Sequence, residues 1–151
     1  MTEIDYRSHL HDLKDKGICP FCQEQTCAVD ENKYAFVLPA RAPYREDHVL
    51  ICPKRHAETL ADFSPEELSD IYELITKWEL LLYREHGELV VFLRQGSVWG
   101  TTGKTIHHLH RHIVPHFEIK YWWTQETSDA RTVYNDKKYN DIQEHMKKYI
   151  S

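Results

Sequence analysis

The stretch Thr105–His116, TIHHLHRHIVPH, is the most unusual part of the chain, because it holds five of the eleven histidines. As a β-strand it would project alternate side chains to opposite faces, so that His108, His110 and His112 lie on one face, about 7 Å apart. Three adjacent imidazoles suit a hydrophobic core poorly, since each needs hydrogen-bond partners and their protonated forms repel one another. The run therefore predicts a functional site.

Two kinds of metal site also place a His-x-His pair on a strand, and neither fits this run well. A cupin-type site needs an acidic ligand a few residues further on, and the first one here is the distant Glu118. A binuclear hydrolase site needs an aspartate within the run, where this chain has Arg111 and His112. A metal-dependent hydrolase is thus the weaker hypothesis.

Length and composition indicate one globular domain, expected over residues 1–151. The chain has 151 residues, of which 41% are hydrophobic and 28% charged, and its formal net charge is -5. That balance argues against binding a nucleic-acid backbone, which needs clustered Lys and Arg, but allows a nucleotide ligand. The polar start, MTEIDYRSHLHDLK, resembles neither a signal peptide nor a membrane span, so we expect a cytoplasmic protein that does not bind membranes.

Apolar patterns predict an α+β domain built on an antiparallel sheet of about five strands. A long amphipathic helix is expected to begin at Ser64, with a capping box to Glu67, and to end at Gly87. Connections that are too short for parallel crossovers favour antiparallel pairing. The expected strands are 34–38, 48–52, 89–93 and 105–114, with 120–123 as a candidate fifth, and the expected terminal helices are 6–16 and 136–150.

The histidine run resembles the signature of the histidine-triad family, His-x-His-x-His followed by two apolar residues. Here His108–Val114 supplies the signature. A second stretch, His48–His56 (HVLICPKRH), is similar to the family's strand that ends in Pro-Lys-x-His. Pro43-Tyr44 resembles the galactose-1-phosphate uridylyltransferase and dinucleoside-tetraphosphate phosphorylase branches. The resemblance covers roughly residues 19–117, leaves 118–151 as a variable tail, and implies a histidine-triad fold.

This resemblance implies a nucleotidyl hydrolase or transferase acting at the α-phosphate of a dinucleoside polyphosphate, nucleoside phosphoramidate or nucleotide sugar. His110 would be the nucleophile, because a neutral imidazole attacks phosphorus and an ordinary imidazole, with a pKa of about 6.5, is largely neutral at pH 7. His112 would contact phosphate and help to fix the tautomer of His110, and Thr105 would meet the leaving group. Hydrolysis and transfer share one covalent intermediate, so the residues leave both open. The other expected substrate contacts are Arg94, Gln95, Gly103, Lys104 and His48.

The second candidate site begins at Cys19-Pro20-Phe21-Cys22, which we expect to form a tight turn. Alone, a CxxC motif is equally a zinc half-site, a redox pair or chance, although a redox role would want a helix starting inside the motif. Some histidine-triad proteins carry a CxxC motif at this place, and the resemblance implies a structural Zn²⁺ held by Cys19, Cys22, His56 and His108. Cys27 fits the ligand spacing less well, and Cys52 is expected in the core.

Several positions depart from the family pattern and affect the expected recognition of the nucleoside. Ala40 or Arg41 falls where many members place an acidic residue on the ribose, and Asp47 replaces a glycine. A zinc-stabilised nucleotide-binding protein with little turnover therefore stands beside the enzyme hypothesis. The resemblance also implies a homodimer, for which the helix from Ser64 and the pair Trp122-Trp123 would suit the interface.

Overall fold

The computed structural model describes residues 2–119 and 131–151. The helices are α1 (Glu3–Asp15), α2 (Pro20–Gln23), α3 (Pro65–His86) and α4 (Asp136–Lys147), with 3-10 turns at Glu24–Cys27 and Leu60–Asp62. The strands are β1 (Asp30–Glu31), β2 (Ala35–Pro39), β3 (Val49–Pro53), β4 (Leu89–Leu93) and β5 (Arg111–Pro115). The candidate strand at 120–123 and the pair Trp122-Trp123 lie outside the described residues.

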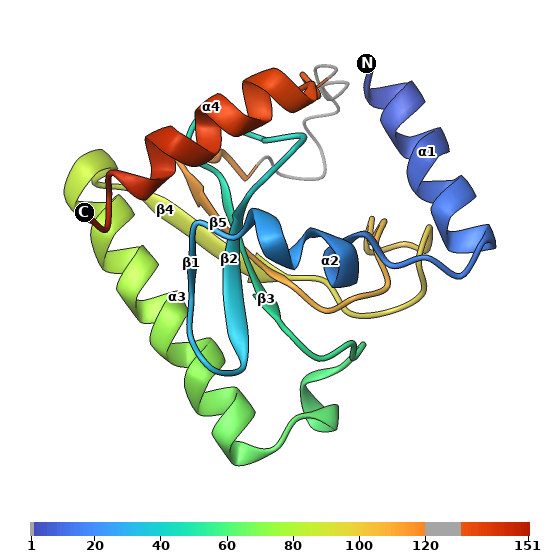
Figure 1. Cartoon of the computed structure of the whole chain (residues 1–151), viewed down its shortest axis with the longest axis horizontal. Coiled ribbons are helices and arrows are strands. Elements are labelled where there is room, and N and C mark those ends of the chain that lie inside the picture. Colours follow the sequence, from blue (N-terminus) through green and yellow to red (C-terminus); the bar gives the residue numbers. More distant parts are fainter. Residues whose placement is uncertain (1, 120–130) are drawn as a thin grey trace.

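The five strands form one sheet in the order β1-β2-β3-β5-β4, and every neighbouring pair is antiparallel. In Figure 1, α3 runs along one side of the sheet, α4 crosses near its upper end, and α1 stands apart at the right. The predicted α+β fold with an antiparallel sheet and one long helix is confirmed.

Alternating side chains give the sheet two different faces. Val37, Ile51 and Ile113 pack with Trp78 and Leu82 of α3, all nearly inaccessible to solvent. The apolar stripe of α3 predicted this packing, because residues three and four apart share one helix face. The opposite face of the sheet is therefore left for the site.

On that opposite face, Phe36, Leu38 and Leu50 pack with Leu10 of α1 and Phe21 of α2. His112 of β5 pairs with Leu50 of β3 across the sheet, and a one-residue step in either strand would turn the side chain away. The register of β3 and β5 thus directs His112 toward α1 and α2 and away from α3.

Two local predictions need correction. Residues 105–110 are not strand, because β4 ends at Leu93 opposite Arg111 and provides no strand partner further on. The motif Cys19–Cys22 is not a plain turn either. Pro20 begins the short helix α2 directly after Cys19, since the fixed φ of proline and its missing N–H suit the first position of a helix.

The ends of α3 follow the predicted signals with one exception. Ser64 Oγ accepts a hydrogen bond from the Glu67 amide at 3.2 Å, and Gly87 ends the helix in the left-handed conformation at a φ of 79°. The Glu67 carboxylate accepts from the Arg55 guanidinium at 3.1 Å, and among the described residues only the Ser64 half of the expected capping box forms. Among the described residues, no helix combines the length and hydrophobicity that a membrane crossing requires.

Candidate active site and metal centre

The segment before β5 leaves the sheet and turns its histidines in different directions. The Leu109 amide donates to the Ala57 carbonyl at 2.8 Å, which ties this segment to the loop that follows β3. His108 and His110 consequently do not stand in a row with His112, and the His110 and His112 rings lie 4.8 Å apart between centroids. The three histidines therefore have three different environments.

Cys19, Cys22, His56 and His108 form a compact cluster with one possible ligand atom from each residue, all within 4.8 Å of one another. The Cys19 and Cys22 sulfurs lie 3.4 and 3.5 Å from His108 Nδ1, and Cys22 Sγ lies 3.5 Å from His56 Nδ1. The structure thus brings together the four predicted metal ligands, from α2, the end of β3 and the segment before β5.

His108 is held in the tautomer that a metal ligand requires. Its Nε2 lies 2.7 Å from the Pro53 carbonyl oxygen, which only accepts, so this nitrogen carries the proton and donates it. Nδ1, which faces the two sulfurs, then has a free lone pair. Burial lowers the pKa of His108 to about 4 and keeps the ring neutral.

His48 and His112 form a buried pair whose proton positions follow from a backbone contact. The Tyr44 amide donates to His48 Nδ1 at 3.2 Å, so a neutral His48 carries its proton on Nε2. Nε2 lies 2.9 Å from His112 Nδ1 and donates to it, which leaves the proton of His112 on Nε2. That Nε2 is buried and has no hydrogen-bond partner among residues 2–119 and 131–151. It is a donor available for a ligand.

His110 takes the opposite tautomer. Its Nδ1 lies 2.8 Å from the His108 carbonyl oxygen and donates to it, so Nε2 holds the lone pair. Burial lowers the pKa of His110 to about 4, with the Lys104 and Arg94 charges acting in the same direction. Burial also lowers the pKa of His48, to about 3, and that of His112 well below its usual value. All three imidazoles are therefore neutral at pH 7.

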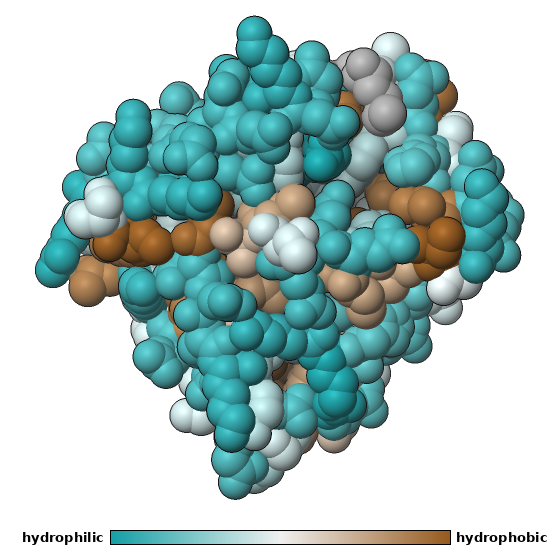
Figure 2. Space-filling view, viewed as in Figure 1, coloured by the Kyte–Doolittle hydropathy of each residue, from teal (hydrophilic) through white to brown (hydrophobic). Residues whose placement is uncertain are grey.

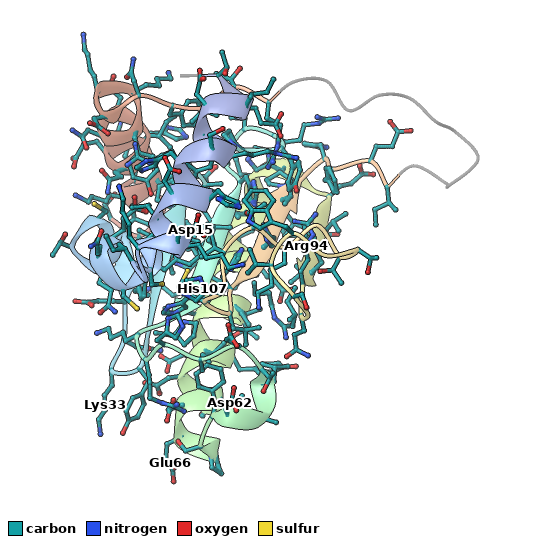
Figure 3. All side chains as sticks on the ribbon, turned by 90° about the vertical axis from the view of Figure 1, so that its right-hand side faces the viewer. Asp15, Lys33, Asp62, Glu66, Arg94 and His107 are labelled. Atoms are coloured by element: carbon teal, nitrogen blue, oxygen red, sulfur yellow. The ribbon has the colours of Figure 1, made fainter. Side chains whose placement is uncertain are left out.

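A cavity of about 60 Å³ lies between the sheet and α1. Four predicted site residues line it, namely His48, Thr105, His110 and His112. Tyr6, Arg7 and Leu10 of α1 line it as well. In Figure 3, which looks from the side of α1, this helix runs across in front of the sheet and ends at Asp15, beside His107. His110, with a lone pair, and His112, with a free donor, thus line the same cavity beneath α1.

Arg94 lies beside the cavity that His48 lines, whereas Gln95, Gly103 and Lys104 are not among its lining residues. The Arg94 guanidinium donates to the Tyr44 hydroxyl at 3.0 Å, and Figure 3 shows this side chain near the end of β4. Gln95 accepts from the Leu60 amide at 2.9 Å, and a side chain at Gly103 would meet the Arg94 Nε atom. Lys104 is buried and borders another cavity.

Two residues near the cavity, Phe92 and Arg131, have no signal in the sequence, and Tyr44 was noted there only within the pair Pro43-Tyr44. Tyr44 stacks on His48 with ring centroids 5.3 Å apart, and Phe92 stacks on His112 at 4.5 Å. The Arg131 guanidinium lies 4.5 Å from the centroid of the Tyr44 ring and also lines the cavity. Arg131 follows the histidine run at a distance no local pattern spans, so only the folded chain reveals its position.

Comparisons with known proteins identify a matching family. The HIT domain family matches residues 23–119 of the chain. The chain is 32% identical over 83 residues to bis(5'-adenosyl)-triphosphatase of Dictyostelium discoideum, and the match covers 54% of either protein. The chain thus spans about half the length of that relative.

Solved structures share the fold at low sequence identity. Diadenosine triphosphate hydrolase of Plasmodium falciparum superposes with a TM-score of 0.65 and 18% identity, covering 83% of this chain and 77% of the other. A zinc-bound histidine triad protein of Mycobacterium smegmatis superposes with a TM-score of 0.62 and 16% identity, covering 87% and 94%.

Proposed function

The chain belongs to the HIT domain family, and on this premise we propose that it hydrolyses a nucleotide conjugate through a covalent nucleotidyl intermediate on His110. The observation that carries the proposal is the tautomer of His110. Its Nδ1 is engaged by the His108 carbonyl at 2.8 Å, and its Nε2 therefore holds a lone pair in the cavity. A neutral, oriented imidazole is the form that attacks phosphorus.

In the first step the lone pair of His110 Nε2 forms a bond to the α-phosphorus. The bond from that phosphorus to the bridging oxygen breaks, and the electron pair leaves with the remaining nucleotide. In the second step a water oxygen bonds to the phosphorus and the water loses a proton to solvent. The N–P bond breaks, its electron pair returns to His110 Nε2, and a nucleoside monophosphate departs. Another acceptor in place of water would give transfer, and the two reactions share the first step.

His112 and Thr105 would stabilise the charge that develops during these steps. The unpaired Nε2–H of His112 is the buried donor next to His110, and a phosphate oxygen would satisfy it. Because His48 donates to Nδ1 of His112, the donor stays on the cavity side. Thr105 lines the same cavity, where its hydroxyl would contact the leaving group. The Arg94 charge would favour bound phosphate.

Diadenosine triphosphate is the substrate that tests this proposal, since relatives of the chain are named for its hydrolysis. With an α-labelled substrate and acid-free quenching, we expect label on the wild-type chain and none on His110→Ala. Turnover by His110→Ala should fall by roughly 10³-fold or more. The matched control is His11→Ala, which removes an exposed imidazole from α1 and should leave turnover unchanged.

Two results would overturn the nucleophile assignment. The first is unchanged turnover by His110→Ala. The second is wild-type turnover without any trapped label when the substrate is limiting. Normal nucleotide affinity in calorimetry with no turnover by the wild-type chain would instead identify a nucleotide-binding protein.

We further propose that the cysteine and histidine cluster holds a structural Zn²⁺. In a tetrahedral site with Zn–S near 2.3 Å and Zn–N near 2.0–2.1 Å, sulfur and nitrogen lie about 3.5 Å apart. The sulfur–nitrogen distances of 3.4 to 3.5 Å agree with that geometry. Four protein ligands would leave no open position, so such an ion would join α2 to the end of β3 and to the segment that holds His110.

We also propose a homodimer through α3. Tyr72, Leu80 and Tyr83 lie on its outer surface with 59%, 50% and 59% of their area exposed. Exposed apolar side chains on one helix face are typical of association surfaces. Light scattering should give the mass of two chains, and Tyr83→Glu should shift it toward one.

A further inference from the structure

Arg131 is held by a carboxylate of the N-terminal helix. Its backbone amide donates to Glu3 Oε2 at 2.9 Å, and its Nε and NH2 donate to Glu3 Oε1 at 3.2 and 3.0 Å. NH1 donates to the Ala42 carbonyl at 3.2 Å. Glu3 also accepts from Arg7 at 3.0 Å. One carboxylate oxygen thus accepts from both Nε and NH2 of the guanidinium, and these are donors that Arg also offers to phosphate.

The same guanidinium stands next to the candidate active site. Arg131 lies 4.5 Å from the Tyr44 ring, Tyr44 stacks on His48 at 5.3 Å, and the His48 and His112 rings lie 5.1 Å apart. Arg131 lines the cavity together with His110. The Arg131 charge therefore borders the same cavity as His110, whose Nε2 would attack phosphorus.

The space under α1 is too small for the substrate of the proposed reaction. The cavity holds about 60 Å³, whereas sites for small organic ligands enclose roughly 300–1,000 Å³. Tyr6, Arg7 and Leu10 close it on the side of α1, and Leu10 is 5% exposed. Figure 2 shows α1 as a hydrophilic ridge at the right, with hydrophobic surface showing between it and the rest of the molecule. Either α1 moves away or only one phosphate-sized group enters.

We propose that Arg131 is a binding site for the phosphate groups of the substrate next to the reacting one, and that Glu3 occupies it in the free protein. A phosphate oxygen pair takes the place of the Glu3 carboxylate on the guanidinium. Release of Glu3 frees the N-terminal turn of α1 and opens the cavity. The N-terminal helix thereby acts as a lid that the polyphosphate chain displaces.

The charges at this contact suit such an exchange. Glu3 is ionised at neutral pH, since the hydrogen bonds from Arg131 outweigh burial and lower the pKa of its carboxyl group. A diphosphate carries more charge than one carboxylate and offers more oxygens to the fork, so it competes well for the same donors. Glu3 and Arg131 keep 14% and 22% of their side-chain area exposed, so solvent reaches the contact that the anion must replace.

Amide hydrogen exchange of α1 tests the lid, with inorganic pyrophosphate as the probe and sodium chloride at matched ionic strength as the blank. In the wild-type chain, saturating pyrophosphate should speed exchange in α1. Glu3→Gln should speed exchange in α1 without any anion. It should also lower the Kd for pyrophosphate by roughly two- to fivefold, because the anion no longer competes with a charged carboxylate. The matched control is Asp12→Asn, which removes the same charge from the same helix and should change neither value.

Substitution of the arginine tests the same site from its other side. Arg131→Met should show fast exchange in α1 with no response to pyrophosphate, and Arg131→Lys should retain part of the response, because it keeps the charge and loses the fork. Exchange in α1 that ignores saturating pyrophosphate, or an equal pyrophosphate affinity in Glu3→Gln and the wild-type chain, would overturn the proposal.

The inference rests on the proposed hydrolase, and the two fail in different ways. Turnover of diadenosine triphosphate without any anion response of α1 would overturn the lid and keep the hydrolase. A response of α1 to pyrophosphate, lost in Arg131→Met, would keep the anion site even if His110→Ala retained full turnover.

Discussion

Replacing His48 with phenylalanine removes the donor that fixes the proton of His112. Phenylalanine keeps a ring of similar volume in a position that is 3% exposed, so no large cavity opens. The buried His112 Nδ1 and the partly buried Tyr44 amide lose their partner. Each such loss costs about 1–3 kcal/mol. His48→Phe should therefore lower the free energy of unfolding by about 2–6 kcal/mol.

The same substitution should change the chemistry at His112. Without a donor at Nδ1, the ring is free to move its proton there and to turn a lone pair toward the cavity. Loss of one donor to a developing negative charge costs roughly 10²–10³ in kcat. His48→Gln is the matched control, because its amide donates in place of Nε2, and it should recover part of the rate.

Three measurements on wild type, His48→Phe and His48→Gln separate these effects. Urea unfolding at pH 7.5 gives the stability, initial rates with diadenosine triphosphate give kcat, and ¹⁵N spectra of the imidazoles report which nitrogen of His112 carries the proton. If His48→Phe retains the Nε2–H tautomer and the wild-type kcat, the hydrogen-bond chain from Tyr44 through His48 does not organise the site.

Four further outcomes follow from the same contacts. Chelation or Cys22→Ser should lower the thermal midpoint sharply, since structural zinc contributes on the order of 10 kcal/mol to folding, whereas Cys27→Ser should leave metal content at one ion per chain. Because the folded pKa of His48 is about 3, the unfolded chain binds more protons between pH 3 and 6.5. The free energy of unfolding should thus fall by about 1.4 kcal/mol for each pH unit below 6.5 through His48 alone, and the lowered pKa of His112 should make this slope steeper. Urea titrations between pH 3 and 6.5 would measure it. Ser64→Ala should cost about 1 kcal/mol in the same assay, because it removes the acceptor for the Glu67 amide.

The sequence predicted those helices and strands whose bounds depend on residues close together in the chain. Helix α3 begins and ends at its expected cap residues, and β4 has the expected bounds, because capping and alternating burial depend on neighbours in sequence. The same rules were wrong for residues 105–110. Alternation there suggested a strand, but a strand needs a partner, and β4 ends opposite Arg111. The helix inside Cys19–Cys22 was missed because a one-turn helix has too few residues for a periodic signal.

For the candidate metal site, the sequence predicted the ligands, and the fold determines how they come together. The resemblance implied a ligand set drawn from three motifs, and its four residues do lie within reach of one ion, namely Cys19, Cys22, His56 and His108. Their convergence depends on the hydrogen bond from His108 to the Pro53 carbonyl, which lies far away in the sequence.

The histidine run by itself determined which residue types are available for chemistry, because imidazoles at this density have no use in a hydrophobic core. Only the tertiary structure decided what each ring does. The proton of His108 sits on the nitrogen that faces the Pro53 carbonyl, and the proton of His110 sits on the nitrogen that faces the His108 carbonyl. In His112 the donor from His48 occupies Nδ1, which leaves the proton on Nε2. The lid over this cavity is equally a matter of folding, since the contact of Arg131 with Glu3 joins positions 128 residues apart.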